Sequence, residues 1–136
     1  MAARGLGFQQ CIWQLQARQF RKAKRLASPV VFFDRGIPDS FAYLKLTHDV
    51  PPRELTELAA RLRYDAVFIL DPLPFYEKDR LRTESKDEAQ QIQNWIYEAY
   101  EHCGYAPMQV PFDTLESRAG FILSRLATGG PGCQPT

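Results

Sequence analysis

Two short apolar runs rich in β-branched and aromatic residues most constrain what this chain can fold into. Residues 29–34 read Pro-Val-Val-Phe-Phe-Asp, and residues 65–70 read Asp-Ala-Val-Phe-Ile-Leu, with Asp71 directly after them. Neither run alternates apolar and polar residues, so each predicts a strand buried on both faces, as in a parallel sheet. A third run at residues 105–110 is weaker because Pro107 interrupts it.

Stretches with helical periodicity separate the three runs. They predict helices at residues 8–26, from Asp39 or Ser40 to about 47, from Pro51 to 62, at 86–102, and from Asp113 or Thr114 to about 126. Strands that alternate with helices predict an α/β fold with three layers, in which helices cover both faces of a parallel sheet. Right-handed crossovers would place the carboxyl ends of all strands on one edge.

The apolar positions of the first and last helices predict which side of each is buried. In the first helix the expected stripe is Phe8, Cys11, Ile12, Leu15, Ala23 and Leu26. In the last helix it is Leu115, Ala119, Ile122 and Leu126.

Composition narrows the class of protein. The chain has 136 residues, which suits one domain, and a net charge of +1. No apolar run approaches the roughly 20 residues of a membrane span, and the three widely spaced cysteines suggest neither a disulfide framework nor a zinc site. We expect a cytoplasmic protein with no membrane partner, with one domain at residues 8–126 and a flexible Gly/Pro-rich tail at 127–136.

Two of the predicted strands end in an aspartate, Asp34 and Asp71. Ligands of open parallel sheets bind outside the carboxyl ends of the strands. Asp34 is followed by Arg35, and a carboxylate beside a guanidinium stays ionised and can orient Mg²⁺ or accept a proton from a hydroxyl. Asp34 and Arg35 are therefore candidate catalytic residues, and Asp34 is also a candidate metal-binding residue. The alternative is that Asp34 caps the turn and Arg35 pairs with it.

A charged stretch at residues 73–85 predicts a mobile loop that carries Arg80 and Arg82. Two arginines above a ligand-binding edge can clamp phosphate oxygens. The alternative is a solvated run of charges.

The polar side of the first helix is strongly basic, with Arg18, Arg21, Lys22, Lys24 and Arg25. Such a face can contact a phosphate backbone. The chain is not basic overall and the stretch lacks interleaved aromatic residues, so we expect an exposed helix face and no nucleic-acid partner.

The segment from residue 30 to residue 44, Val-Val-Phe-Phe-Asp-Arg-Gly-Ile-Pro-Asp-Ser-Phe-Ala-Tyr-Leu, carries a resemblance to a known group. It resembles the predicted AAA-type ATPases of P-loop fold that group with the kinase domain of ribosylnicotinamide kinases. The family pattern is an apolar strand ending in Asp-Arg-Gly, then Pro-Asp, then a helix that carries a tyrosine. The similarity continues through residues 64–72, 76–84 and 105–111 and covers about residues 10–126.

The resemblance implies roles for individual residues. Asp34 would be the Walker-B-like or base carboxylate, Arg35 would contact the acceptor substrate or a phosphate, and Asp39 would support substrate binding. Arg80 and Arg82 would belong to a lid over the nucleotide phosphates. The implied reaction is phosphoryl transfer or hydrolysis with Mg²⁺ and ATP or GTP, with a small-molecule acceptor as partner.

One family element is missing from the sequence, which contains no Gly-x-x-x-x-Gly-Lys-Ser/Thr loop. That loop cradles phosphates with its backbone amides. We therefore expect a P-loop NTPase or kinase-like fold that is incomplete at its N-terminus, and weak or no turnover by this chain alone. It is either part of a complete kinase or ATPase or a non-catalytic binding or regulatory module. Without the family's first strand, runs 30–33 and 67–70 would pair directly or leave free edges that favour self-association.

Overall fold

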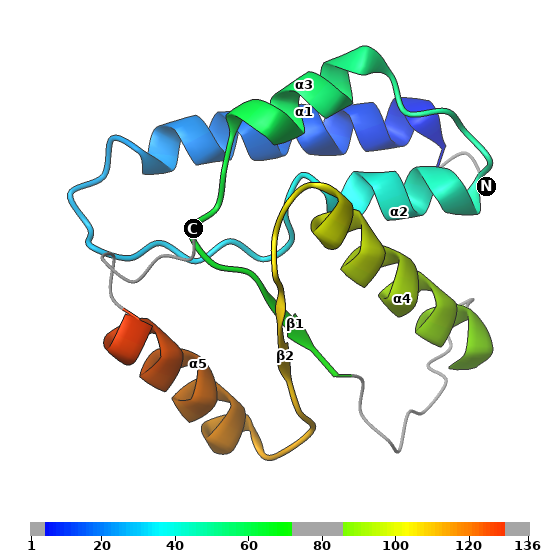
Figure 1. Cartoon of the computed structure of the whole chain (residues 1–136). Coiled ribbons are helices and arrows are strands. Elements are labelled where there is room, and N and C mark those ends of the chain that lie inside the picture. The colour runs from blue at the N-terminus through cyan, green and yellow to red at the C-terminus, as the bar shows by residue number, and fades with distance from the viewer. Residues whose placement is uncertain (1–4, 72–85, 130–136) are drawn as a thin grey trace.

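The computed structural model describes residues 5–71 and 86–129. Within these ranges the elements follow the order α1 (Leu6–Ala23), α2 (Asp39–Leu46), α3 (Arg53–Arg61), β1 (Phe68–Leu70), α4 (Lys86–His102), β2 (Met108–Val110) and α5 (Leu115–Gly129) (Figure 1). The order of helices is the predicted one, and the chain is a mixed α/β fold. No helix among the described residues is both long and apolar enough to cross a membrane.

The sheet of the described chain consists of β1 and β2, which pair in parallel with Phe68 opposite Met108 and Leu70 opposite Val110. Backbone bonds extend the pairing at both ends, because Met108 donates to the carbonyl of Val67 at 2.9 Å and Asp71 donates to that of Val110 at 2.9 Å. Helix α4 connects the two strands. The predicted parallel pairing is confirmed, but the sheet is smaller than the predicted three-layer arrangement.

The strand predicted at residues 29–34 is wrong, because this segment has no regular secondary structure. A strand exists through ladder bonds to a neighbour, and no such bond joins 30–33 to β1 in the described chain. The side chain of Phe32 is 63% exposed. Phe33 anchors the segment instead, with its ring stacked on Phe20 at 5.8 Å and set edge-on to Tyr64 at 5.7 Å.

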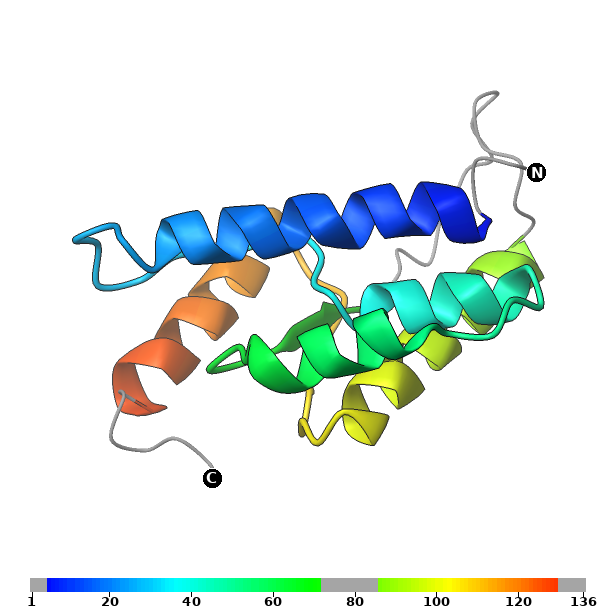
Figure 2. The same cartoon turned by 90° about the horizontal axis from the view of Figure 1, so that it is seen from above.

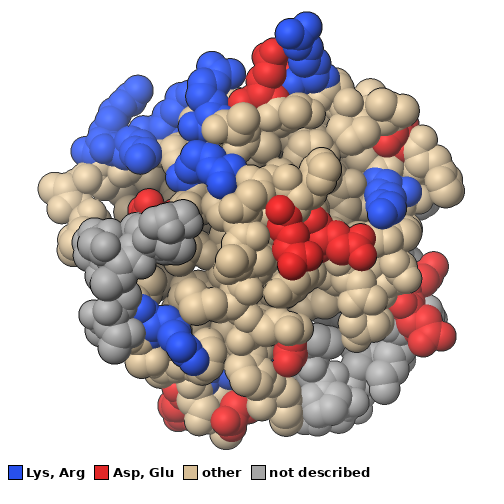
Figure 3. Space-filling view, in the orientation of Figure 1, with Lys and Arg blue, Asp and Glu red and all other residues tan. Residues whose placement is uncertain are grey.

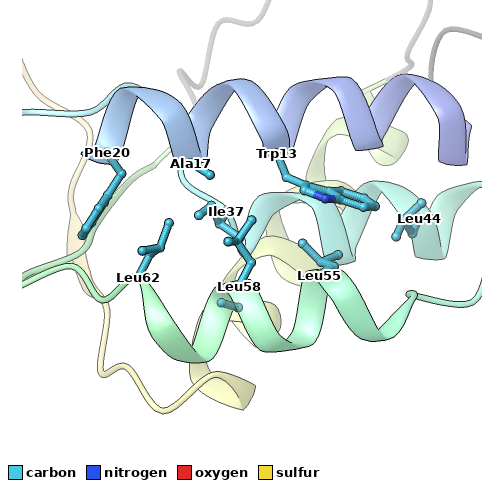
Figure 4. Close-up of a cluster of buried hydrophobic side chains, with 9 residues drawn as sticks. Trp13, Ala17, Phe20, Ile37, Leu44, Leu55, Leu58 and Leu62 are labelled. Atoms are coloured by element: carbon cyan, nitrogen blue, oxygen red, sulfur yellow. The ribbon is translucent and has the colours of Figure 1, made fainter. Parts of the chain in front are cut away.

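The main core lies between helices rather than on the sheet. Side chains of α1 and α3 face each other across it, and residues from α2 and the turn before it close one side (Figure 4). Its members are Trp13, Ala17, Phe20, Ile37, Leu44, Leu55, Leu58, Ala59 and Leu62. Figures 1 and 2 show α1 and α3 running side by side in the same direction. Each large member contributes roughly 1.5–3 kcal/mol by its burial.

Two predicted helix faces need correction. Helix α1 buries Gln9, Trp13, Ala17 and Phe20, whereas Phe8, Cys11, Leu15 and Leu26 of the predicted stripe are exposed. Both stripes repeat every 3.6 residues, and the one with two large aromatic rings removes more apolar area from water. Helix α5 does not bury its predicted stripe either, since Leu115 is 82% exposed and Ile122 is half-buried. Helix α3 buries Leu55, Leu58 and Ala59 against the core.

Candidate functional site

The turn at residues 34–39 connects the segment 30–33 to helix α2. Arg35 adopts a left-handed backbone conformation with φ of 81°. That region is rare for residues other than glycine, because the Cβ atom approaches the neighbouring backbone. The turn therefore holds an arginine in a strained conformation at the protein surface.

The carboxylate of Asp39 organises the turn from inside. The Asp39 residue is 8% exposed. One carboxylate oxygen accepts hydrogen bonds from the backbone nitrogen of Gly36, at 3.3 Å, and from the hydroxyl of Tyr100. The other accepts from Nη1 of Arg35 at 3.3 Å. These three donors satisfy the buried group and tie the turn to α4.

The guanidinium of Arg35 is held in place but not enclosed. Nη1 also donates to the hydroxyl of Tyr43 at 3.1 Å, and the Arg35 side chain remains 54% exposed. Burial alone would lower the pKa of Arg35, but the nearby Tyr43 and Asp39 outweigh it and raise the pKa. Both bonds use Nη1, so the remaining N–H donors of the fork can bind an anionic ligand.

Three tyrosines brace the turn from behind. The hydroxyl of Tyr64 accepts a hydrogen bond from the backbone nitrogen of Ile37 at 3.0 Å. The hydroxyl of Tyr105 in turn accepts one from the backbone nitrogen of Tyr64 at 3.0 Å. Burial raises the pKa of Tyr64 to about 12. Burial, followed by the adjacent Asp39, also raises the pKa of Tyr100. These hydroxyls therefore stay neutral at physiological pH and act as structural donors and acceptors.

A family model described as an AAA domain matches residues 1–118, a span that contains the turn, α4 and both strands. The chain belongs to this AAA domain family. At the family level it is therefore a nucleotide-binding, P-loop NTPase-like protein. Neither a curated protein nor a solved structure matches the chain.

Within this AAA domain, the two aspartates that were predicted to share one sheet edge differ in setting, because Asp71 follows β1 and Asp34 follows a segment without regular secondary structure. Asp34 is exposed and forms no ion pair or hydrogen bond with the described residues. Asp71 accepts a bond from Nε2 of Gln109 at 3.0 Å. The described residues include no group of three or more His, Cys, Asp or Glu side chains that could hold a metal ion. They do not fit a complete Mg²⁺ site around Asp34, whose catalytic and metal-binding roles stay predictions.

The other predicted site residues divide into two sets. Arg35 and Asp39 form an ion pair at 3.3 Å, and their roles in substrate binding stay predictions. Arg80 and Arg82 lie outside the described residues. Sequence reasoning missed Tyr100, because a single tyrosine within a long helix carries no signal that it reaches a turn some 60 positions earlier.

Proposed function

We propose that this AAA domain is part of a P-loop ATPase or small-molecule kinase-like enzyme, in which Arg35 contacts a phosphate or the acceptor substrate. The observation that carries the proposal is the strained, half-exposed arginine, with Asp39 and Tyr43 fixing one of its terminal nitrogens. Glycine would suit its backbone better, since left-handed strain in other residues costs about 1–3 kcal/mol. An arginine kept there at such a cost supports a binding role for its side chain.

Nucleotide chemistry needs more than Arg35. The sequence contains no Gly-x-x-x-x-Gly-Lys-Ser/Thr loop, and the described residues show no metal-binding cluster. We therefore expect this chain alone to bind ATP or GTP with Mg²⁺ weakly and to turn it over little. In the complete enzyme, which we place in the cytoplasm, Asp34 would serve as the catalytic carboxylate, Asp39 would hold the substrate-binding turn, and Arg80 and Arg82 would close over the phosphates.

The test is a titration of the ¹⁵N-labelled chain with Mg·ATP and Mg·GTP, followed by NMR. We expect weak binding with shifts concentrated at residues 34–43, and a marked loss of that binding in Arg35→Gln. Arg118→Gln removes the same charge from α5 and should bind like the wild type. Shifts that avoid this turn, or an Arg35→Gln chain that binds normally, would refute the assignment. Strong ATP hydrolysis that Asp34→Ala abolishes would refute the expected inactivity.

A second function, a non-catalytic binding module, is favoured by the exposed apolar segment 30–33. Val30, Val31, Phe32 and Phe33 lie unpaired at the surface, and β1 has a strand neighbour on one side in the described chain. Free strand edges and exposed apolar runs promote association. The partner that this second function would bind is another copy of the same chain.

Sedimentation velocity over a range of protein concentrations tests this self-association. Phe32→Ser should shift the equilibrium toward the monomer. Leu115→Ser removes an apolar side chain on α5 that is more exposed than Phe32, 82% against 63%, and should leave the equilibrium unchanged. A wild-type chain that stays monomeric at all concentrations would eliminate this candidate.

A further inference from the structure

An open groove of about 370 Å³ lies between α1 and α3, away from the turn at residues 34–39. Its walls carry three arginines, Arg18 and Arg21 from α1 and Arg61 from α3. Figure 3 shows Lys and Arg side chains gathering at the upper left, over the C-terminal ends of these two helices. The positive charges are therefore concentrated at one end of the groove.

Among the residues that the structure describes, the three arginines have no charged partner. None of them forms an ion pair or a side-chain hydrogen bond with any residue in the ranges 5–71 and 86–129. Of the two acidic residues in the same groove, Glu57 is paired with a cation, whereas Glu54 is bonded to neutral amides and keeps its negative charge. Glu57 accepts from Nε of Arg53 at 3.0 Å, and Glu54 accepts from two glutamines of α1. The three arginines of the groove thus repel one another, and an anion bound between them would relieve that repulsion.

Helix ends explain only part of this arrangement. The partial negative charge at a helix C-terminus attracts basic residues, and Arg21 and Arg61 lie in the last turns of their helices. That attraction fades within the last turn, and Arg18 lies further back in α1. Arg18 therefore does not interact with the helix C-terminus, and its side chain is available to a ligand in the groove.

We propose that the basic end of this groove is a binding site for a compact polyphosphate group, such as a diphosphate or triphosphate. Guanidinium groups bind phosphate oxygens through two parallel hydrogen bonds, and arginines from two helices can grip one group from both sides. Glu54 and Glu57 lie toward the N-terminal end of α3, where they would repel a long uniform polyanion threaded along the groove. The charge pattern thus favours a short anion over a nucleic-acid strand.

The experiment is an NMR and calorimetric titration of the whole chain with inorganic tripolyphosphate in about 0.1 M salt. The shifts are expected at residues 14–21 and 54–61 and not at 34–43, which separates this site from the one around Arg35. Arg18→Gln combined with Arg61→Gln should weaken binding at least about tenfold. The matched control, Lys22→Gln combined with Arg25→Gln, removes the same charge in and just after the last turn of α1, outside the groove, and should change affinity less than about threefold.

Three results would overturn the proposal. They are no binding of tripolyphosphate by the wild type, equal weakening by both double variants, and tighter binding of duplex DNA that the control pair weakens as much as the groove pair. The last two would show a diffuse basic surface instead of a site. Far-UV circular dichroism verifies that both variants fold, as expected because all four side chains belong to exposed residues.

Discussion

In the Arg35–Gly36 pair, the residue with the backbone conformation that favours glycine is the arginine. The positive φ belongs to Arg35, while Gly36 is not among the residues with positive φ. Gly36 is required by space instead. A Cβ atom added there would lie 2.5 Å from the hydroxyl oxygen of Tyr100 and 3.2 Å from the ring of Tyr64. The pair therefore combines backbone strain at one residue with close packing at the next.

Gly36→Ala should destabilise the protein by about 1–3 kcal/mol, as overpacking of a tight site does. The Tyr100 hydroxyl cannot simply move, because it is bonded to Asp39. Urea unfolding measures the change. Gly7→Ala is the control, since a Cβ there meets nothing within 4 Å in α1 and should be neutral or stabilising by up to about 1 kcal/mol. Equal stability of Gly36→Ala and the wild type would contradict the packing argument.

Replacing Arg35 by two small residues isolates the backbone strain. Arg35→Gly and Arg35→Ala lose the same contacts with Asp39 and Tyr43, but only alanine keeps a Cβ at φ of 81°. We expect the glycine variant to be more stable than the alanine variant by about 1 kcal/mol in urea unfolding. If the alanine variant is the more stable of the two, the turn is not strained as described.

The raised pKa of Tyr64 predicts that the protein loses stability at alkaline pH. Its pKa is raised by burial from about 10 in the unfolded chain to about 12 in the fold, so its contribution is complete below pH 10 and is lost as the pH rises toward 12. Urea unfolding at several pH values from 8 to 11.5 measures this decline. Tyr64→Phe cannot ionise and should decline less steeply, although Tyr100 and Tyr105 also have raised pKa values. An equally steep decline in Tyr64→Phe would exclude Tyr64 as a cause.

At the scale of elements, the helices could be predicted from sequence patterns within each segment. The predicted 86–102 agrees with α4 at both ends, because apolar periodicity defines the helix and Gly104, with φ of 95°, ends it. Thr114 was one of two predicted caps for α5, and its hydroxyl accepts from the backbone nitrogen of Ser117 at 3.1 Å. Capping and periodicity depend on neighbours in sequence, so they can be recognised without the fold.

The two predictions that failed, a strand at 29–34 and the buried face of α1, depended on contacts with residues distant in sequence. An apolar run becomes a strand only if another strand bonds to it, and residues 30–33 have none in the described chain. Which of the two apolar stripes of α1 is buried depends on the side chains of α3 that pack against it. The predicted alternative paired Arg35 with Asp34, but the structure pairs Arg35 with Asp39 instead. The contact between Asp39 and Tyr100 joins residues too far apart in sequence to be predicted.

Helix α5 should depend on its cap more than a well-packed helix does. Its first-turn residue Leu115 is exposed, and the described side chains contribute little to the core. Thr114→Ala should therefore destabilise α5 locally by about 1 kcal/mol. Hydrogen exchange measures this as faster exchange at amides of α5, with unchanged rates in α1 and α3. Uniform acceleration throughout the chain would show that α5 unfolds only together with the rest.

At the scale of the whole molecule, the two candidate sites meet the core at different residues, the turn at Ile37 and the groove at Ala17 and Leu58. The buried cluster joins α1, α2 and α3, and the Arg35 turn is held between that cluster and α4 through Tyr64 and Tyr100. The groove on the outer side of α1 and α3 touches neither tyrosine. Variants of the exposed groove arginines should therefore leave the turn intact, which allows the two sites to be studied separately.

The segregation of charge on α1 has a consequence for how the protein moves and meets surfaces. The first acidic residue of the chain is Asp34, so all of α1 is free of negative charge despite a net charge of only +1. Such a molecule carries a large electric dipole moment, and its approach to a charged surface is oriented rather than random. On a cation-exchange resin it would adsorb by the ends of α1 and α3, and remain bound at pH values above its isoelectric point.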